Sequence, residues 1–244
     1  MAKAGIQIEF GLVGDQVVPK VTAKSTPNWL ATEGTQGTAT TPTLSQVSLT
    51  PKTVIGSLQY SRQFSKQANA PQFAARELLR TVGTAIDQAI INGSGVSGVP
   101  LGLIGTSGVQ TQSGTTLNAG CATMKRKSAE ANVVDEQISF LSTPAVRELL
   151  EGREKATGGG KFVWDKDQVA DRAAYVSTDV PTATMLCGDF SLIYLGMWGV
   201  GLTLEINPYE QTNFRAGIIQ ARVLVSCDVG VLHPASFIVA SSIT

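Results

Sequence analysis

Two stretches of the chain have a regular hydrophobic pattern. After Asn69-Ala70-Pro71, apolar residues recur every three or four positions as far as Asn92-Gly93, and this spacing predicts an amphipathic helix. These apolar residues are Ala75, Leu79, Val82, Ile86, Ala89 and Ile90. From Ile219 to Cys227 the odd-numbered positions are apolar, which predicts a strand with one buried face. The chain therefore combines helix and strand.

Weaker patterns predict further elements between these two. Gly120 to Asn132 is expected to form a helix with a narrow apolar face, and Ile138 to Leu141 a short strand. Ser142-Thr143-Pro144 provides a cap and a first-turn proline, so a helix should follow as far as Gly152. The remaining predictions are a short helix over 189–195 and a strand over 200–206.

The first sixty residues contain little that could form a core. Residues 1 to 28 lack helical periodicity and predict an extended arm. Thr, Ser, Gly and Gln dominate from Gly34 to Pro51, whereas Lys52 to Gln63 alternates apolar and polar residues, which is typical of a strand. Together the two segments predict a long β-hairpin. Because a two-stranded hairpin is marginal in water on its own, we expect this one to lie against a partner.

Composition counts against several classes of protein. A chain of 244 residues can bury roughly 70% of its unfolded surface, so it needs neither disulfides nor a metal for its core. Lys plus Arg and Asp plus Glu are both 19, so no net charge indicates nucleic acid or a membrane as the main partner. No long apolar run or signal-peptide pattern is visible, and we expect a soluble protein made in a cytoplasm. No linker or repeat divides the chain, which predicts one cooperative unit with lobes.

The cysteines favour packing over chemistry. Cys121, Cys187 and Cys227 are odd in number and none belongs to a C-x-x-C pair, so neither a disulfide framework nor a zinc site is indicated. We interpret them as buried thiols in a reducing compartment.

Two glycine-rich stretches resemble nucleotide motifs without having their context. Gly93 to Gly98 satisfies G-x-G-x-x-G, but it follows a predicted helix, where a dinucleotide fingerprint must follow a strand. Gly158-Gly159-Gly160-Lys161 resembles a phosphate loop, but Lys155 replaces the first glycine and Phe162 the Ser or Thr. We predict no nucleotide site and no cofactor.

Catalytic and metal-binding residues do not assemble in the sequence either. His233 is the only histidine, so any triad or histidine metal site would depend on one residue. Glu148 and Glu151 stand at helical spacing beside arginines, which indicates a solvated helix face and not an acid/base pair. Lys125-Arg126-Lys127 could contact DNA phosphates, although surface charge is the favoured interpretation. We predict no catalytic residues, no metal site and no enzyme.

A series of short motifs follows one order along most of the chain. They are Trp29 to Gly34, Leu49-Thr50-Pro51-Lys52, Ser61-Arg62-Gln63, Ile86 to Gly95, Gly98 to Leu103, Gly188-Asp189-Phe190-Ser191 and His233-Pro234-Ala235-Ser236-Phe237. Each motif is weak alone, but their order and spacing resemble the tailed-bacteriophage capsid family whose prototype is the Hong Kong 97 major capsid protein. The resemblance implies an α+β subunit with the Hong Kong 97-like capsid fold.

In that fold four parts are expected. They are an N-terminal arm (1–33), an extended E-loop hairpin (34–60), a peripheral domain carrying the long helix (61–151 and 213–244) and an axial domain (152–212). The resemblance implies a major capsid protein that self-assembles through hexamers and pentamers into an icosahedral shell around double-stranded DNA. Its implied partners are copies of itself, a scaffolding protein or segment, a portal protein and, as an option, a decoration protein, with no membrane. The expected location is the virion capsid, after assembly in the host bacterial cytoplasm.

The resemblance also implies roles for particular residues. In the family the E-loop lies across a neighbouring subunit, so Leu44, Val47 and Leu49 are predicted to lie at a subunit interface. Some members join subunits by an isopeptide bond between an E-loop lysine and an asparagine of the peripheral domain. Here Gln46 and Gly217 stand at those positions. We therefore predict a shell held by noncovalent contacts.

Two other interpretations remain open. An encapsulin has the same fold and encloses enzymes, but it usually begins with a helix, and residues 1 to 28 do not resemble one. A soluble enzyme or a β-rich adhesin is the other alternative. The missing catalytic constellation counts against an enzyme, and unpaired cysteines without a signal peptide count against an adhesin.

Overall fold

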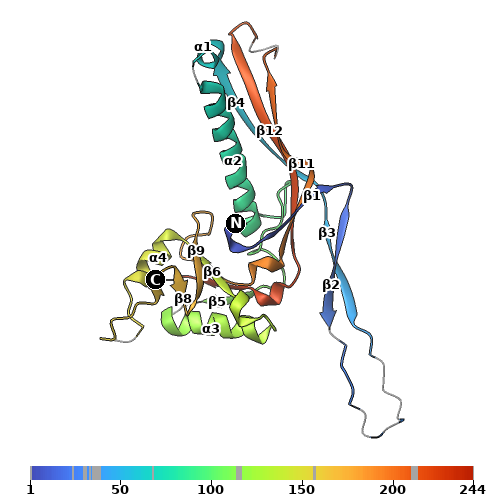
Figure 1. The fold of residues 1–244 in the computed structure, drawn as a ribbon, viewed down its shortest axis with the longest axis vertical. Helices are drawn as coiled ribbons and strands as arrows, with labels where there is room; N and C mark the ends of the chain where they lie inside the picture. The colour runs from blue at the N-terminus through green and yellow to red at the C-terminus, as the bar shows by residue number, and fades with distance from the viewer. Residues whose placement is uncertain are drawn as a thin grey trace.

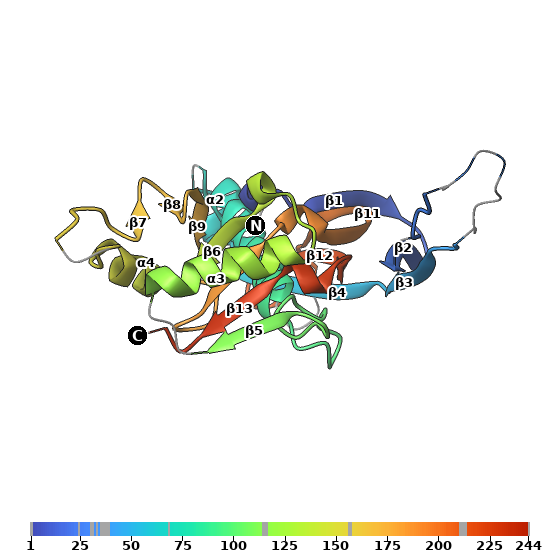
Figure 2. The same cartoon turned by 90° about the horizontal axis from the view of Figure 1, so that it is seen from below.

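The described residues form two lobes and a projecting hairpin (Figure 1). The structure is a computed structural model that describes residues 2–23, 25–29, 32, 34, 40–67, 69–113, 117–155, 158–209 and 214–243. Figure 2 shows the hairpin extending to one side of the molecule and the more compact of the two lobes to the other.

The long lobe, at the top of Figure 1, is a sheet covered on one face by a long helix. Its described strands, in sheet order, are β1 (Gln7–Leu12), β11 (Ile193–Asn207), β12 (Ile218–Val231) and β4 (Lys52–Ser61). The covering helix is α2 (Ala70–Asn92), and the short α1 (Arg62–Ser65) precedes it. β11 pairs antiparallel with β12, and β1 adds to the edge in parallel.

Helix α2 confirms the clearest sequence prediction, because it has the predicted ends. Half of the predicted stripe is buried, namely Val82, Ile86 and Ile90. Near the start of the helix, however, Leu78 is buried and the predicted Leu79 is exposed. Leu78 lies one turn before Val82, and both side chains approach Gly56 of β4, which fixes the helix face that meets the sheet.

Gly56 sets how closely α2 approaches the sheet. A Cβ atom at this position would lie 2.6 Å from Val82 Cγ2 and 3.2 Å from Leu78 Cδ1. The alternation of β4 points Val54, Leu58 and Tyr60 to the same side, as predicted. A glycine in a strand often marks such a close approach, and here it lets the helix lie against the backbone of β4.

Substitution of this glycine provides a test of the helix packing. Gly56→Ala should lower the free energy of unfolding by about 1–3 kcal/mol, because the added methyl group overpacks the contact with α2. Gly83→Ala is the matched control, since a Cβ atom at Gly83 meets nothing within 4 Å. It should raise the free energy of unfolding by about 0.5–1 kcal/mol through helix propensity. Urea denaturation measures the change in the free energy of unfolding for each variant. Equal changes in Gly56→Ala and Gly83→Ala would contradict this packing.

The compact lobe, at the lower left of Figure 1, contains a sheet of seven short strands within the described chain. In sheet order they are β5 (Gln110–Ser113), β13 (Ile238–Ser241), β10 (Met185–Gly188), β6 (Ser139–Ser142), β9 (Arg172–Val176), β8 (Gln168–Val169) and β7 (Trp164–Asp165). Its helices are α3 (Leu117–Glu130) and α4 (Pro144–Glu151). Thr143 caps α4, accepting from Val146 N at 3.3 Å, as the Ser-Thr-Pro start predicted.

The two lobes share a core through the sheet of the compact lobe. Successive residues of one strand alternate between two buried clusters, because side chains in a strand point to opposite faces. In β10, Leu186 faces the cluster of the long lobe, whereas Met185 and Cys187 face α3 and α4. This continuity agrees with the predicted single unit with lobes.

Three boundary predictions differ from the structure. The helix expected over 189–195 is only a single 3-10 turn at Phe190–Leu192, because Asp189 caps it and Ile193 already pairs with Val231. The strand expected over 200–206 is the second half of the longer β11. The helix expected over 120–132 starts three residues earlier, as α3.

The hairpin prediction chose the wrong partner strand. β3 (Thr43–Leu49) pairs antiparallel with β2 (Gln16–Ala23), where the sequence had suggested pairing with the segment after Pro51. That later segment, β4, pairs with β12 in the long lobe. The projecting element therefore contains β2 and β3, and we call the described residues of 16–49 the hairpin from here on.

The two lobes do not follow the ranges of the four predicted parts, which stay predictions. The described residues of 110–151, expected in the peripheral domain, lie with the strands of the compact lobe, and so does β13. β11, expected largely in the axial domain, lies in the long lobe because it pairs with β12. The predicted arm is not free throughout, since β1 joins the same sheet. Positions 1, 24, 30, 31, 33, 35–39, 68, 114–116, 156, 157, 210–213 and 244 of the predicted parts lie outside the described residues.

Candidate assembly surface

The hairpin meets the long lobe at its root, where two glycines provide a flat seat. Leu49, at the end of β3, is fully buried. Its Cδ2 lies 3.2 Å from where a Cβ atom of Gly230 would stand, and its Cδ1 lies 3.4 Å from the corresponding point at Gly196. Val47 Cγ1 approaches Gly230 in the same way at 3.0 Å. Larger residues at these glycines would push the hairpin away from the sheet.

A buried carboxylate fixes the chain between β3 and β4. Asp228 of β12 is almost fully buried, and its Oδ1 accepts from Lys52 Nζ at 2.7 Å. Its Oδ2 accepts from the backbone N of Thr50 at 3.0 Å, and Oδ1 also accepts from its neighbour Val229 N at 2.9 Å. Because these bonds hold both sides of the Thr50-Pro51 link, the hairpin leaves the long lobe in a defined direction.

The opposite face of the hairpin is apolar and exposed. Strand pairing places Val21 directly across from Leu44, and Val17 lies four residues nearer the root on the same face. All three side chains are exposed, Leu44 to 66%. Figure 1 shows this part of the chain standing clear of both lobes. An apolar strand face without cover indicates a surface that another chain contacts.

The three residues predicted at a subunit interface therefore separate. Leu44 lies on the exposed face, and its place at a subunit interface stays a prediction. Val47 and Leu49 have the opposite parity in the strand and face the seat on the long lobe instead. Their burial stabilises the hairpin root within one chain.

The two positions predicted for a cross-link lie far apart in one chain. Gln46 pairs with Pro19 in the hairpin and is exposed. Gly217 adopts a positive φ of 65° at the far end of the long lobe, where its carbonyl oxygen accepts from Arg62 N at 2.8 Å. Any bond between these positions would have to join two copies. Gln46 has no amine and Gly217 has no side-chain carboxamide, so this pair cannot form the isopeptide bond of the family.

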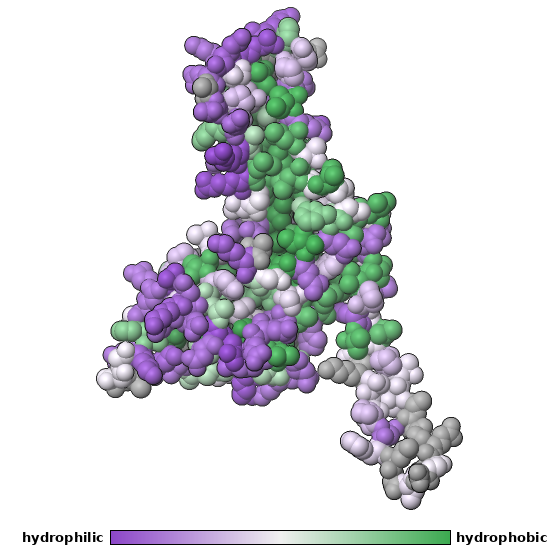
Figure 3. Space-filling view, in the orientation of Figure 1, coloured by the Kyte–Doolittle hydropathy of each residue, from purple (hydrophilic) through white to green (hydrophobic). Residues whose placement is uncertain are grey.

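A second exposed apolar surface was not predicted. The pairing of β11 with β12 skips from Trp198 to Thr203, so Gly199 to Leu202 form a bulge. Val200 in this bulge is 92% exposed, and Phe10 of β1 lies beside Gly201, with Cε1 3.5 Å from the Cβ point. The only sequence signal was the Gly-Val-Gly spacing. In Figure 3 hydrophobic residues extend along the long lobe beside a hydrophilic edge.

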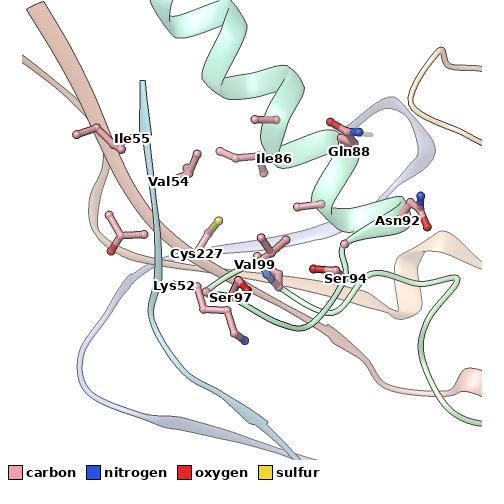
Figure 4. Close-up of a pocket in the computed structure, with 16 residues that line it drawn as sticks. Lys52, Val54, Ile55, Ile86, Gln88, Asn92, Ser94, Ser97, Val99 and Cys227 are labelled. Atoms are coloured by element: carbon pink, nitrogen blue, oxygen red, sulfur yellow. The ribbon is translucent and has the colours of Figure 1, made fainter. Parts of the chain in front are cut away.

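A cavity of about 500 Å³ lies between β4, the end of α2 and the Gly93 to Pro100 loop (Figure 4). The G-x-G-x-x-G stretch contributes Gly93, Ser94, Ser97 and Gly98 to its lining. As predicted, this stretch follows a helix and does not open one. Lys52 and Cys227 also line the cavity, but the lysine is paired with Asp228. The arrangement offers an apolar groove without an acid/base pair.

The cysteines are buried, as predicted. Burial raises the pKa of Cys121 and of Cys227 to about 11, so both thiols are protonated near neutral pH. Burial likewise raises the pKa of Cys187. The structure therefore gives these thiols the role of small apolar core residues.

The charged motifs form local pairs. Lys125 lies 3.3 Å from Asp135, Arg126 pairs with Glu130, and Lys127 donates to the carbonyl oxygen of Thr111 at 3.4 Å. These contacts agree with surface charge, and contact with DNA stays a prediction.

The predicted helix face also forms a local ion pair, and the histidine bonds to its neighbour through its backbone. Arg147 Nε lies 2.7 Å from Glu151 Oε1, and this bond raises the pKa of the guanidinium. His233 begins the last 3-10 turn, where its carbonyl oxygen accepts from Ser236 Oγ at 2.6 Å. Within the described ranges, no three His, Cys, Asp or Glu side chains gather as a metal site would need. None of the described helices has the length and apolar composition of a membrane span.

The chain is similar in sequence to known capsid proteins of phages. Residues 3–242 match the Phage capsid family. The chain is 25% identical, over 240 residues, to the major capsid protein of Halomonas phage phiHAP-1. The match covers 97% of this chain and 39% of that relative, so the chain spans well under half of the relative's length.

Solved structures share the fold over nearly the whole chain. The capsid of a native GTA particle superimposes with a TM-score of 0.79 at 11% identity, covering 99% of this chain and 89% of that one. The Gordonia phage Cozz structure superimposes with a TM-score of 0.74 at 16% identity, covering 98% and 85% of the two chains. The resemblance found in the sequence motifs is thus matched by the three-dimensional arrangement.

Proposed function

The chain belongs to the phage capsid family, and we propose from this membership that it is a major capsid protein that self-assembles into an icosahedral shell. The observation that carries the proposal is the hairpin. Its root is fixed by Leu49 and Asp228, while its outer face carries exposed Val17, Val21 and Leu44. A rigid element with an uncovered apolar face fits a protein that binds copies of itself.

The parts of the subunit correspond to parts of the family fold. We assign the hairpin, residues 16–49, as the E-loop that lies across a neighbouring subunit. The long lobe takes the role of the peripheral domain and the compact lobe that of the axial domain. Hexamers and pentamers of this subunit would tile the shell, with double-stranded DNA inside.

Further partners follow from the same role. A scaffolding protein or segment would guide assembly, a portal protein would occupy one vertex, and a decoration protein would be optional. Without the lysine and asparagine of the family cross-link, many noncovalent contacts would hold the shell, each repeated at every copy. A covalent ladder of subunits on a denaturing gel would contradict this part of the proposal.

Electron microscopy of the purified chain tests the proposed function. Expression with and without a scaffolding protein, followed by negative staining, should reveal closed icosahedral particles in at least one of the two conditions. A chain that stays monomeric in both would contradict shell formation. Particles that enclose an enzyme and exclude DNA in an infected host would instead indicate an encapsulin.

A further inference from the structure

The second half of β11 has an open outer edge. β1 pairs with β11 only as far as Trp198, and from Thr203 to Asn207 the described partner of β11 is β12 alone. The outer edge of a strand presents a row of backbone N–H and C=O groups that can pair with another strand. Residues 203–207 contain neither lysine nor proline, which often block such pairing. This edge is therefore ready to accept a further strand.

One face of this open edge is apolar. Leu204 pairs with Val223, and Val223 pairs with Gly56, which approaches α2. Because directly paired residues share one face of a sheet, Leu204 and also Ile206, two positions later, lie on the face that carries α2. Both side chains are nevertheless exposed. Figure 1 shows the reason, since α2 lies on the β4 side of the lobe and β11 on the far side.

Helix α2 extends this apolar surface. Glu77 lines a cavity against β4, so that side of the helix faces β4. Leu79 points about 200° around the helix from Glu77 and therefore lies on the flank toward β11. Its side chain is exposed, although it belongs to the predicted apolar stripe. We call Leu79, Leu204 and Ile206 together the β11 edge surface.

Two arginines stand beside the β11 edge surface. Arg76 and Arg80 are exposed and lie one turn apart on α2. Among the described residues no carboxylate pairs with Arg76. Arg80 Nη1 lies 3.7 Å from Glu77 Oε2, and both side chains of this pair are largely exposed, so the pair contributes little. The positive charge of this part of the helix is therefore available to a partner.

The strand register places the arginines level with the open edge. Ile206 pairs with Ala221, and Ala221 pairs with Leu58. Leu58 and Ala74, near the start of α2, line the same cavity. Ile206 therefore stands at the same height of the lobe as the first turns of the helix, where Arg76 lies. A strand added beside β11 would pass along the apolar residues and close to this positive charge.

We propose that the β11 edge surface binds an extended segment of a different protein, which adds a strand to β11 over 203–207. In this mode of recognition, backbone hydrogen bonds provide affinity and alternate side chains provide specificity. The segment carries apolar residues at alternate positions, which cover Leu204 and Ile206, and carboxylates that face Arg76 and Arg80. Because one subunit provides the whole site, the contact goes beyond the proposed function and does not require a shell.

A second copy of the chain fits this edge less well. The hairpin strands β2 and β3 carry Lys20 and contain no aspartate or glutamate, so they would bring a like charge toward Arg76 and Arg80. β1 contains Glu9, but it already pairs with the first half of β11. The charges therefore favour an acidic segment of another protein.

Binding of designed peptides to the purified full chain tests the proposal. The parent probe is a fluorescent peptide that alternates valine with threonine and has two glutamates at each end. One comparison peptide replaces the valines by serine, and another replaces the glutamates by glutamine. In fluorescence anisotropy the parent should bind, and each replacement should lower the association constant by about tenfold or more.

Each other outcome of the peptide measurement would overturn the proposal. Equal binding of the valine-free peptide would indicate a general contact with anions, such as DNA phosphates. Equal binding of a peptide with the sequence of residues 43–49 would indicate a second copy as the partner. No binding of the parent peptide would contradict the site altogether. Failure of the chain to form particles would refute the proposed function and leave this contact intact.

Substitutions locate the site on the subunit. Ile206→Asp should abolish binding of the parent peptide, because it removes apolar surface and repels the glutamates. Ile55→Asp is the matched control, since Ile55 is 57% exposed against 55% for Ile206 but lies on the opposite face and on the other edge strand of the sheet. Circular dichroism checks that both variants are folded. Equal affinities of Ile206→Asp and Ile55→Asp would overturn the proposal.

Two further measurements test the charge and the added strand. Arg76→Glu should weaken binding about tenfold and reduce its dependence on salt, whereas Arg76→Lys should keep both. Hydrogen exchange should slow at the backbone amides of residues 203–207 when the peptide binds, because the outer N–H groups acquire acceptors. Protection that appears only elsewhere in the chain would contradict strand addition at β11.

Discussion

A chain that carries Val17→Asp and Leu44→Asp should fold normally but form no closed particles. Both side chains lie on the exposed face of the hairpin. They are not directly opposite each other, because the pairing of β2 with β3 places Val17 across from Ser48. The new carboxylates therefore do not repel one another strongly within the hairpin. In an interface, each substitution removes about 1.5–3 kcal/mol of apolar burial and adds a charge that would have to be buried. This loss recurs at every copy in a shell.

The control variant introduces the same two negative charges outside the hairpin. Val96→Asp with Val134→Asp introduces the same two carboxylates at exposed valines outside the hairpin. Circular dichroism and urea denaturation should show the hairpin variant, the control variant and the unsubstituted chain to be equally folded. Of the two variants, electron microscopy should find particles in the control only. Normal particles from the hairpin variant would refute the role of this face.

Replacing Asp228 by alanine should cause a large loss of stability. The substitution leaves Lys52 Nζ and the Thr50 N–H without their acceptor. Removing one partner of a buried ion pair costs about 3–5 kcal/mol, and because Lys52 is partly exposed we expect about 3 kcal/mol. The midpoint of urea denaturation should fall accordingly while its slope stays constant. Assembly should weaken as well, because these bonds fix the direction of the hairpin.

An exposed ion pair in the same sheet provides the comparison. Arg222 Nε and Glu205 Oε2 are also 2.7 Å apart, but about half of each side chain is exposed. Glu205→Ala should therefore lower the free energy of unfolding by no more than about 1 kcal/mol. The loss of unfolding free energy in Asp228→Asn should lie between those of Glu205→Ala and Asp228→Ala, since the amide oxygen of asparagine can still accept a backbone N–H. Equal losses of unfolding free energy in Glu205→Ala and Asp228→Ala would contradict the role of burial.

Elements set by local pattern could be predicted from the sequence. The helix over 70–92 follows from a continuous stripe with a proline at its start, and α4 follows from Thr143 and Pro144. The parity of β12 was also correct, since Ala221, Val223 and Val225 are buried. In each case the residues that determine the element lie within a few positions of one another.

Strand partners depended on contacts that no local pattern contains. The polar segment 34–51 and the alternating segment 52–63 suggested one long hairpin, but Asp228 accepts from Thr50 N and fixes the link between the two segments on the long lobe. β3 is then free to pair with β2, and β4 with β12. Asp228 is separated from Thr50 by most of the chain, so nothing near the link predicted its effect.

The assembly surface could be predicted in part. Leu44 and Leu49 are five positions apart in one strand and must face opposite sides, which alternation alone could have indicated. Which side is buried depends on Gly196 and Gly230, because only these positions leave room for Leu49. Their importance was invisible in the sequence, where they are two glycines among 25.

The glycine seat has a mechanical consequence. The hairpin acts as a lever whose pivot is the contact of Val47 and Leu49 with the sheet. Seven residues of β3 extend about 24 Å at about 3.4 Å per residue, so a tilt of about 5° at the pivot displaces the strand end by about 2 Å. If neighbouring subunits join through this lever, one methyl group at Gly196 or Gly230 would change the angle between them. The curvature of the shell, and hence its diameter, would then be sensitive to the smallest side chains in the subunit.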